Sequence, residues 1–521
     1  MAQNLFMASS LFTRSKKIVK NVFSKQERYI QSQDITLKKM LYKARNTQFG
    51  KHFGFDQILI QKDVQFEFRA RVPIHNYELM HSWWGRELAG ERNVSWPGMP
   101  KYFAMSSGTS QGSSKFIPVT DDQLKAMIRG GKRQLFSIFK TDIPKDFLAK
   151  HYLQLGGSTD LNFDGSKYSG DLSGILSSRF PYWFEPLSQP SKEIRFEKDW
   201  YKKIEKMVAE APNWDVAFLS GGPAWIKMLL EQIIQRYELS NIHQLWPNLS
   251  VYSWGATSIS PYKKQIDDMM GKPIYYFESY VASEGFISFQ KKVNSTGMAL
   301  VLRNNMFFEF LAFNEDNFDQ DGELKNNARA IGINDVEKGV NYAIVITTCA
   351  GAWRYLIGDT VEFTNLAAFE IKITGRTKQY LSLCGEHLTV DNMNQGIERT
   401  ALELNFGIAE YSVRGLKYPD GSLGHCWFIA YSSEIQKPSI DIIRNSLDKH
   451  LCVLNDDYAT ERAHVLKKME LYLLPEIDFI DFMEIRGKLG GQVKFPRVMA
   501  ETVYQEWVKF LGARHQLDNF T

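Results

Sequence analysis

The chain has 521 residues, which is too long for one ordinary hydrophobic core and predicts two or three domains. Hydrophobic residues make up 44%, aromatic residues 13% and charged residues 23% of the sequence, as in a folded rather than a disordered protein. Lys and Arg number 63 against 59 Asp and Glu, and the resulting net charge of +4 is too small and too evenly spread to indicate nucleic-acid binding.

Cysteine usage and hydropathy indicate the compartment. The four cysteines are widely separated and form no Cys-x-x-Cys pair, which favours a reduced setting and speaks against a zinc site. They are Cys349, Cys384, Cys426 and Cys452. No apolar run reaches membrane-spanning length. In residues 1–20 the basic residues follow the apolar patch, whereas a secretory signal carries them first. We expect a cytoplasmic protein that binds no membrane, with a docked first helix rather than a transit peptide or surface helix.

The first strong helical pattern covers residues 22–47, where apolar side chains recur near helical spacing. Gly50 is expected to end this helix. Residues 49–55 and 72–77 are expected to provide core packing and a turn.

A run of small, hydroxylated and glycine residues follows between Phe103 and Val119. Gly108 and Gly112 allow positive φ angles and a close approach to a ligand, and successive exposed N–H groups in such a turn form a concave anion site. The hydroxyl donors of the run are Ser106, Ser107, Thr109, Ser110, Ser113 and Ser114. Together with the positive charge of Lys115, these groups suit a polyphosphate.

The spacing excludes two familiar phosphate loops. A Walker loop needs four residues between its first glycine and a Gly-Lys-Ser/Thr end. Here three residues separate Gly108 from Gly112, and Lys115 is not followed by Ser or Thr. The three-glycine dinucleotide pattern is missing as well. An ordinary Ser/Gly surface turn stays open as the alternative, but strand-like residues at 102–104 and 116–119 favour a loop held between two strands.

Strands, tight turns and helices then alternate, which indicates parallel α/β layers. Thr120 and Gln123 form a capping box for a helix that begins beside the loop. Residues 214–219 and 249–254 each read as a strand that leads through a turn into a helix. Because ligands of such sheets bind at the carboxyl ends of the strands, we expect these turns to lie at one edge.

Another strand-like segment, 273–277, precedes a turn with Tyr280, Ser283 and Glu284, and a β-rich section follows. Its strands are expected at 298–302, 306–311 and 342–347, with an acidic excursion at 314–327. The Gly358-Asp359 pair between strand-like residues is typical of a turn. The remainder predicts a compact α/β unit. Its helices are expected at 391–404 and 439–451, and its strands at 411–414 and 425–430.

The string from Ser106 to Pro118 resembles the phosphate loop of the adenylate-forming superfamily, which includes acyl-CoA ligases, luciferases and nonribosomal adenylation domains. It is most similar to that of one branch, the Gretchen Hagen (auxin-responsive promoter) family of acyl-acid amido synthetases. Further matching motifs follow in the family's order up to about residue 497. They are Tyr280-x-x-Ser283-Glu284, Gly358-Asp359, Gly375-Arg376 and Gln492-x-Lys494-x-Pro-Arg497.

The resemblance implies roles for individual residues. Tyr280 would lie against adenine, Ser283 would reach a phosphate, Glu284 would hold Mg²⁺, and Asp359 would accept hydrogen bonds from the ribose hydroxyls. The implied nucleotide-binding residues are Ser106, Ser107, Gly108, Thr109, Ser110, Gly112, Tyr280, Ser283, Asp359 and Arg376. The implied catalytic residues are Lys115, Arg376 and Lys494. The implied substrate-binding residues are Trp225, Trp254, Gly255, Ala256 and Thr257.

The resemblance also implies the fold, an α/β architecture in two parts. Residues 1–376 would form a large domain of layered α/β subdomains with a β-rich portion, and residues 377–521 a small mobile cap. The sequence departs from the family pattern at two places. Arg354 and Tyr355 stand in the opposite order to the family's Tyr-Arg pair, and His387 stands where the plant enzymes carry a lysine.

The implied activity is ATP- and Mg²⁺-dependent adenylation of a small carboxylic acid, followed by transfer of the acyl group to an amine, which the resemblance implies is an amino acid. Two alternatives stay open: transfer to coenzyme A, and a non-catalytic nucleotide-binding relative. No Gly-x-Ser-x-Gly elbow and no His-Glu-x-x-His motif occurs, as expected for a reaction that needs no protein nucleophile. We expect a monomer or weak dimer.

Overall fold

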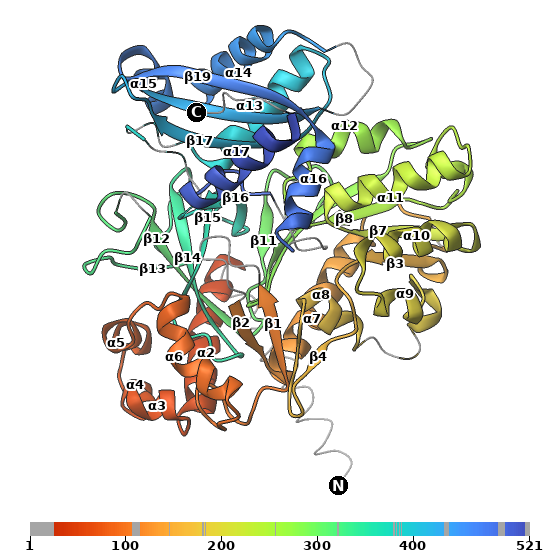
Figure 1. The fold of residues 1–521 in the computed structure, drawn as a ribbon. Coiled ribbons are helices and arrows are strands. Elements are labelled where there is room, and N and C mark those ends of the chain that lie inside the picture. Colours follow the sequence, from red (N-terminus) through yellow and green to blue (C-terminus); the bar gives the residue numbers. More distant parts are fainter. Residues whose placement is uncertain are drawn as a thin grey trace.

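The fold is α/β, with a large N-terminal body and a smaller C-terminal cap (Figure 1). The computed structural model describes residues 25–106, 115–144, 146–179, 182, 184–255, 257–319, 322–378, 381, 383–384, 386, 388–431, 437–487 and 495–515. None of the helices within these ranges is long and apolar enough to cross a lipid bilayer.

Five helices open the described chain and pack beside the β-rich part of the body (Figure 1). They are α2 (Lys25–Ala44), α3 (Gln48–His52), α4 (Phe55–Leu59), α5 (Val64–Arg71) and α6 (Tyr77–Leu88). The prediction that Gly50 ends the first helix is wrong. That helix ends at Ala44, and Gly50 lies inside α3, whose N-cap Thr47 accepts a hydrogen bond from the Gly50 N–H. A Cβ on Gly50 would lie 2.2 Å from the Ala44 carbonyl oxygen, so close packing requires the glycine.

A small four-stranded sheet carries the two ends of the glycine-rich run. Its order is β2-β1-β5-β4, and β1 pairs antiparallel with β2 with Ser106 opposite Lys115. The strands are β1 (Tyr102–Ser106), β2 (Lys115–Val119), β4 (Asn162–Phe163) and β5 (Tyr168–Gly170), with helices α7 (Asp121–Ile138) and α8 (Leu172–Ser177). The expected pair of strands around the run is therefore confirmed.

A twelve-stranded sheet unites the parallel and the β-rich parts of the body. Its order is β13-β12-β14-β15-β16-β11-β10-β9-β8-β7-β3-β6. From β6 to β9 the neighbours are parallel, and the rest are antiparallel. The parallel strands are β3 (His151–Leu155), β6 (Ser188–Gln189), β7 (Val216–Gly221), β8 (Val251–Trp254) and β9 (Tyr275–Ala282). The others are β10 (Gly285–Phe289), β11 (Met298–Leu300), β12 (Met306–Ala312), β13 (Ile331–Gly332), β14 (Asn341–Thr348), β15 (Tyr355–Asn365) and β16 (Glu370–Arg376).

Helices between the parallel strands cover this half of the sheet, as predicted (Figure 1). They are α9 (Lys192–Phe196), α10 (Trp200–Glu210), α11 (Pro223–Arg236) and α12 (Ser260–Asp268), with short 3-10 turns at Phe147–Ala149, Glu185–Leu187, Ala211–Asn213 and Ile242–Gln244. Part of one predicted turn and the whole of another are strands instead, while Ser283 and Glu284 do form a turn between β9 and β10. Tyr280 lies within β9, and Gly358 and Asp359 lie within β15, where Gly358 adopts a φ of 88°.

The cap is a three-stranded sheet, β17-β18-β19, with helices on both faces. Its elements are α13 (Val390–Glu403), β17 (Ile408–Lys417), β18 (Leu423–Tyr431), α14 (Ile440–Leu454), α15 (Asp456–His464), β19 (Leu466–Pro475), α16 (Glu476–Ile485) and α17 (Glu501–His515). Successive side chains of a strand point to opposite faces. Trp427 of β18 therefore packs with α13 and α14, and Phe428 packs with α16 and α17. The four elements predicted for this unit are confirmed.

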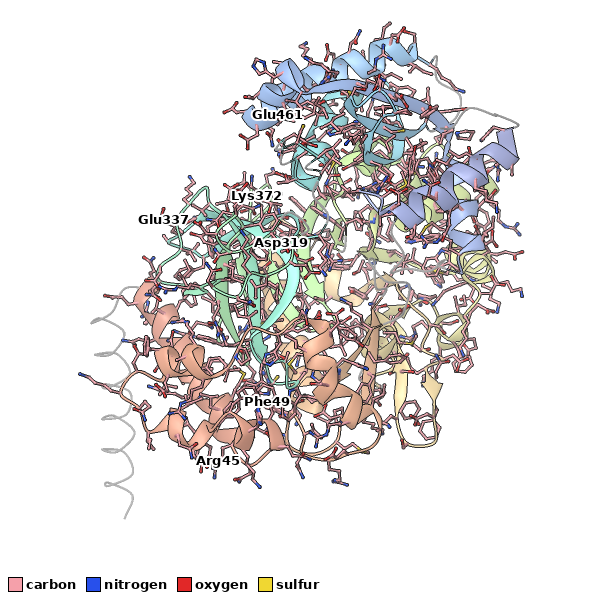
Figure 2. All side chains as sticks on the ribbon, turned by 60° about the vertical axis from the view of Figure 1, so that its left-hand side comes forward. Arg45, Phe49, Asp319, Glu337, Lys372 and Glu461 are labelled. Carbon is pink, nitrogen blue, oxygen red and sulfur yellow. The ribbon has the colours of Figure 1, made fainter. Side chains whose placement is uncertain are left out.

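Ion pairs and polar contacts join the cap to the body. Lys372 of β16 lies 3.7 Å from Asp391 in the first turn of α13, and Lys227 of α11 lies 3.1 Å from Glu476 of α16. Figure 2 shows Lys372 at the end of the body nearest the cap and Phe49 toward the opposite end. The cap thus rests on one end of the large sheet. The division at residues 376 and 377 stays a prediction.

A buried ion cluster anchors the N-terminal helices to the β-rich part. Glu309 of β12 is fully buried and accepts from Arg69 Nε at 3.0 Å and from Arg354 Nε at 3.1 Å. Arg354 also donates to the carbonyl oxygens of Arg69 and Val72. The reversed Arg354-Tyr355 pair of the sequence therefore places a structural arginine in the core, at a φ of 43°.

Replacing this arginine should destabilise the fold. The change Arg354→Met leaves part of the Glu309 charge buried without its partner, and breaking such a pair costs about 3–5 kcal/mol. The free energy of unfolding, measured by urea denaturation, should fall by this order. Arg329→Met, at an exposed position, serves as the control. An equal, small loss in both variants would contradict the assigned role.

Candidate active site

Two side chains, each from a different strand, meet on the carboxylate of Asp359, which lies in a third strand. The Tyr280 hydroxyl, from β9, donates to Asp359 Oδ2, and Arg376 Nε, from β16, donates to Asp359 Oδ1 at 2.7 Å. Asp359 and Arg376 stand directly opposite each other in the antiparallel pair β15–β16. Tyr280 reaches them although β10 and β11 separate its strand from β16. The structure thus brings together three residues that are up to 96 positions apart in the sequence.

Burial and charge shift the pKa values of Tyr280 and Arg376. Burial raises the pKa of the Tyr280 phenol well above its usual range, and the negative charge of Asp359 raises it further. The same aspartate raises the pKa of Arg376. The phenol therefore stays a donor and the guanidinium stays charged. A carboxylate offers about four acceptor positions, so Asp359 keeps acceptor capacity for a ligand hydroxyl.

Glu284 and Lys115 lie close enough to this cluster to interact with its charges, and Lys115 is the first residue of β2. Glu284 lies in the turn between β9 and β10 and is 7% exposed. Burial raises its pKa from 4.5 to about 7, and the charge of Asp359 raises it too, against the opposing effects of Arg376 and Lys115. Burial lowers the pKa of Lys115, and Glu284 counteracts that shift. The end of the glycine-rich run and the Glu284 carboxyl are thus electrostatic neighbours.

The N-terminus of α7 is tied to the same turn. Thr120 accepts from the Gln123 N–H at 3.2 Å, so the predicted N-cap is confirmed. The reciprocal half of the capping box is wrong: the Gln123 side chain donates to the Ser283 carbonyl oxygen at 2.8 Å instead. The first turn of α7 therefore fixes the β9–β10 turn that carries Glu284.

Tyr77 is a neighbour that sequence reasoning missed. It begins α6, where the sequence predicted only a turn, and its hydroxyl accepts from the Phe116 N–H at 2.9 Å. The Lys115 ammonium lies 5.0 Å from the centre of the Tyr77 ring, within the range of a cation–π contact. No local sequence signal indicates this contact, because 38 positions separate the two residues.

The residues predicted to bind the acid line the ends of β7 and β8. Trp254 is buried at the end of β8, and Trp225 on α11 packs edge-on against Trp200 with ring centres 4.6 Å apart. Gly255 follows β8, and a Cβ there would lie 2.6 Å from the Ser279 carbonyl oxygen. The Thr257 N–H donates to the Gly255 carbonyl oxygen at 2.9 Å, which closes a tight turn. Trp225 and Trp254 belong to one apolar cluster, so part of their surface is core packing.

Several predicted residues lie outside the described ranges. They are Ser107, Gly108, Thr109, Ser110, Gly112, Ala256, His387 and Lys494. For Ser106 the description covers the backbone, which pairs with Lys115 across β1 and β2. The implied roles of all these residues stay predictions.

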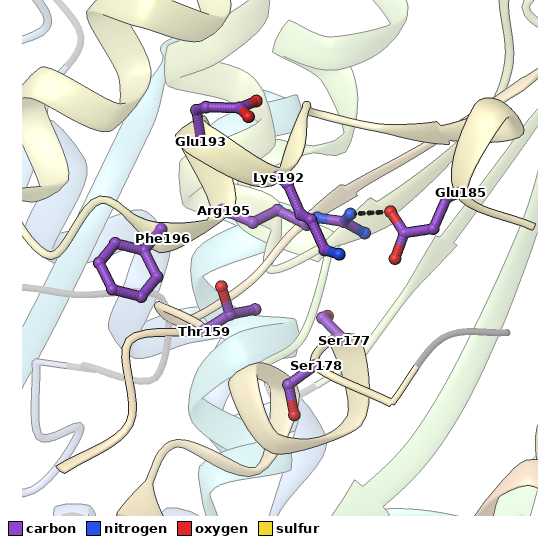
Figure 3. A pocket seen from close by; sticks show the side chains of 8 residues that line it. All are labelled: Thr159, Ser177, Ser178, Glu185, Lys192, Glu193, Arg195 and Phe196. Atoms are coloured by element: carbon purple, nitrogen blue, oxygen red, sulfur yellow. Dashed lines mark hydrogen bonds and ion pairs between the residues drawn. The ribbon is translucent and has the colours of Figure 1, made fainter. Parts of the chain in front are cut away.

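An open pocket of about 530 Å³ lies on another part of the body (Figure 3). Its lining residues are Thr159, Ser177, Ser178, Glu185, Lys192, Glu193, Arg195 and Phe196. Arg195 is buried and forms an ion pair with Glu185. Among the predicted site residues that the structure describes, none lines this pocket, so it is separate from the Asp359 cluster.

Three family profiles match successive parts of the chain. The GH3 family N-terminal domain matches residues 19–160 and 158–274, the GH3 family central domain matches residues 299–376, and the GH3 family C-terminal domain matches residues 391–503.

Individual proteins align over most of the chain. A jasmonoyl–L-amino acid synthetase, JAR4 of Nicotiana attenuata, is 22% identical over 90% of this chain and 91% of its own. The indole-3-acetic acid-amido synthetase GH3.4 of Arabidopsis thaliana is 28% identical over 90% of this chain and 89% of its own. Among solved structures, the GH3.15 acyl acid amido synthetase has a TM-score of 0.75 at 17% identity and covers 96% of this chain and 95% of its own. A 2-hydroxyisobutyryl-CoA ligase has a TM-score of 0.60 at 13% identity, with 94% and 93% covered.

The raised pKa of Glu284 should appear in the pH dependence of stability. The unfolded chain loses this proton near pH 4.5 and the folded protein near pH 7, so raising the pH between these values should destabilise the ligand-free fold. Glu284→Gln removes this effect, and relative to wild type it should gain at most roughly 3 kcal/mol between pH 5 and pH 8.

Chemical denaturation at both pH values measures this gain. Glu205→Gln, an exposed carboxyl on α10, is the control and should follow wild type. A Glu284→Gln variant whose stability keeps the wild-type pH profile would show that this carboxyl is ionised well below pH 7.

Proposed function

Since this chain belongs to the GH3 family, whose three domain profiles match most of its length, we propose that it is an ATP-dependent ligase that joins a carboxylic acid to the amine of an amino acid. It first forms an acyl-adenylate and then an amide. The observation that carries this proposal is the Asp359 cluster, where Tyr280 and Arg376 converge beside Glu284 and Lys115. We assign residues 1–376 to the body that binds the nucleotide and the acid, and residues 377–521 to the cap.

In this proposal the nucleotide lies between β1 and β2 of the four-stranded sheet and β9 and β15 of the twelve-stranded sheet. The ribose hydroxyls donate to Asp359, and the adenine lies against Tyr280. The phosphates occupy the run from Ser106 to Lys115, with Ser283 beside them. Tyr280 and Arg376 support the proposal because they orient both Asp359 oxygens from the body itself. Hydrogen bonds that are formed before the ligand arrives reduce the cost of ordering the site.

The donor set also fits Mg²⁺. Glu284 is a buried carboxyl whose pKa is raised to about 7, so nearby positive charge does not fully stabilise its anion. Magnesium prefers carboxylate and phosphate oxygens, and Glu284 would be its protein ligand. When bound, the ion supplies positive charge to the phosphates.

The first step needs two anions to meet. An oxygen of the substrate carboxylate attacks the α-phosphorus, and the bond from phosphorus to pyrophosphate breaks. Positive charge and alignment supply most of the catalysis of phosphoryl and nucleotidyl transfer. Lys115 and Arg376 provide this charge from the body, and Lys494 provides it from the cap.

In the second step the neutral amine of the acceptor attacks the acyl carbon, the bond to AMP breaks, and the amine nitrogen loses a proton. Two named relatives act on jasmonate or indole-3-acetic acid. We propose a small organic acid for this chain too, and a cytoplasmic monomer or weak dimer as the working form.

A partial-reaction assay tests the first step. Exchange of labelled pyrophosphate into ATP should appear only when a suitable carboxylic acid and Mg²⁺ are present. An acid panel followed by mass spectrometry with amino acids or coenzyme A identifies the acceptor, and the expected products are amides. Acid-dependent exchange with only thioester products would make the chain a coenzyme A ligase. No exchange with any acid would favour a non-catalytic nucleotide-binding relative.

The change Asp359→Asn tests the ribose assignment. It keeps the size of the side chain but removes the charge that holds Arg376 and the ribose hydroxyls, and hydrogen bonds to charged groups contribute about 1.5–3 kcal/mol. The KM for ATP should therefore rise roughly ten- to a hundredfold, with a smaller effect on the KM for the acid. Asp335→Asn, an exposed position, is the control. An unchanged KM for ATP would refute the ribose contact.

A further inference from the structure

Three side chains from three separate segments meet where the cap touches the body. Tyr262 comes from α12 of the body, Glu410 from β17 of the cap, and Arg497 from the segment before α17. The Tyr262 hydroxyl donates to Glu410 Oε2 at 3.3 Å, and Arg497 forms an ion pair with the same carboxylate. Arg497 Nη1 also donates to the Tyr411 carbonyl oxygen at 2.8 Å. We call Tyr262, Glu410 and Arg497 the interdomain clasp.

The clasp is shielded from water. Tyr262 is 2% exposed, and the side chains of Arg497 and Glu410 are 11% and 17% exposed. Burial raises the pKa of Tyr262 and lowers that of Arg497, and each residue counteracts the shift of the other. Polar groups in a low-dielectric interior are costly when they lose a partner. The clasp therefore strongly favours the one arrangement of the cap in which all three groups meet.

The clasp also fixes the segment that follows Lys494, the predicted catalytic lysine of the cap. Residues 495–499 run along β17: the Val413 N–H donates to the Arg497 carbonyl oxygen and the Met499 N–H donates to the Val413 carbonyl oxygen, both at 2.9 Å. Ser412 Oγ donates to the Pro496 carbonyl oxygen at 2.6 Å. The segment is thus hydrogen-bonded to the cap sheet, and its Arg497 meets Tyr262 of α12 on the Glu410 carboxylate.

The body side of the clasp lies next to the acid site. Helix α12 begins at Ser260, two residues after the turn 255–258 that contains the proposed acid-binding positions. Figure 1 shows α12 beside the cap, at the upper right of the view. Docking Arg497 on the first turn of α12 therefore brings residues 495–498 to the end of the body where the acid and the α-phosphate would meet.

Other contacts across this junction do not involve that segment. Lys264 Nζ donates to Asn405 Oδ1 at 2.6 Å from an exposed position, and Lys227 pairs with Glu476 on α16. They hold the cap near the body, and neither of them includes a residue of 495–499.

We propose that the interdomain clasp positions the cap for the adenylation step and is dispensable for the transfer step. This inference rests on the proposed function, because it assumes that Lys494 acts on the α-phosphate. Tyr262, Glu410 and Arg497 are positioning residues: they act through the segment that they hold, and none of them needs to touch a substrate.

The change Tyr262→Phe tests the clasp most gently, since it removes one hydroxyl and keeps the ring. A small misplacement of a catalytic group slows a reaction by up to a hundredfold, so kcat for pyrophosphate exchange should fall roughly tenfold or more. The KM values for ATP and acid should change little. Transfer from synthetic acyl-adenylate to the amino acid should stay within about twofold of wild type.

Two further variants make the result specific. Tyr237→Phe removes a hydroxyl that donates to the Val208 carbonyl oxygen inside the body, and it should leave both steps unchanged. Glu410→Gln should slow exchange in the same way as Tyr262→Phe, and the double variant should be no slower than the slower single variant, because both changes break one unit. Equal losses in both steps, or an unaffected exchange rate in Tyr262→Phe, would overturn the proposal.

Hydrogen exchange gives a readout that does not depend on activity. Amides of residues 495–505 should exchange faster in Tyr262→Phe than in Tyr237→Phe, and unchanged protection would overturn the clasp. If wild type itself shows no acid-dependent pyrophosphate exchange, the proposed function fails, and the adenylation role fails with it. The hydrogen-exchange comparison then still decides whether the clasp holds the cap.

Discussion

The Asp359 carboxylate is the contact on which the arrangement of the site depends. One of its oxygens accepts from a strand of the antiparallel half of the sheet, and the other accepts from the last strand of the parallel half. The positive φ of Gly358 lies just before it, inside a strand that continues on both sides. A residue with a side chain would be strained there. The backbone conformation at Gly358 and the position of the Asp359 carboxylate are therefore linked.

Charge balance explains why the proposed reaction needs two domains. The body alone brings Asp359 and Glu284 against Arg376 and Lys115, so its buried charges are nearly matched before any nucleotide binds. A nucleotide and a substrate carboxylate add only negative charge. In the proposed mechanism the missing positive charge comes from a metal ion and from the cap. A cap that contributes charge must be held at the right place during that step and must be able to leave afterwards.

The sequence was sufficient for the fold class and for many of its elements, but it missed the short helices α3 to α6. Contiguous patterns predicted the strands around the glycine-rich run, the parallel layers and the sheet of the cap, because hydrophobic periodicity is a local property. Prediction from the sequence failed where a contact with a distant segment determines the local structure or the partner of a side chain. The Ala44 carbonyl beside Gly50, the Ser283 carbonyl that takes the Gln123 side chain, and the Tyr77 ring below Lys115 are all tertiary contacts. The same holds for Tyr262 and Arg497, which are 235 positions apart in the sequence.

The unbroken twelve-stranded sheet has a consequence for dissecting the chain. The central family profile begins at residue 299, inside β11, and that strand pairs with β10 on one side and β16 on the other. A fragment cut to the profile would leave the β10 side of β11 without its partner, as an open row of backbone donors and acceptors. Such an edge is a template for association with another chain. A fragment that keeps β11 paired on both sides therefore has to include β10 as well as β16.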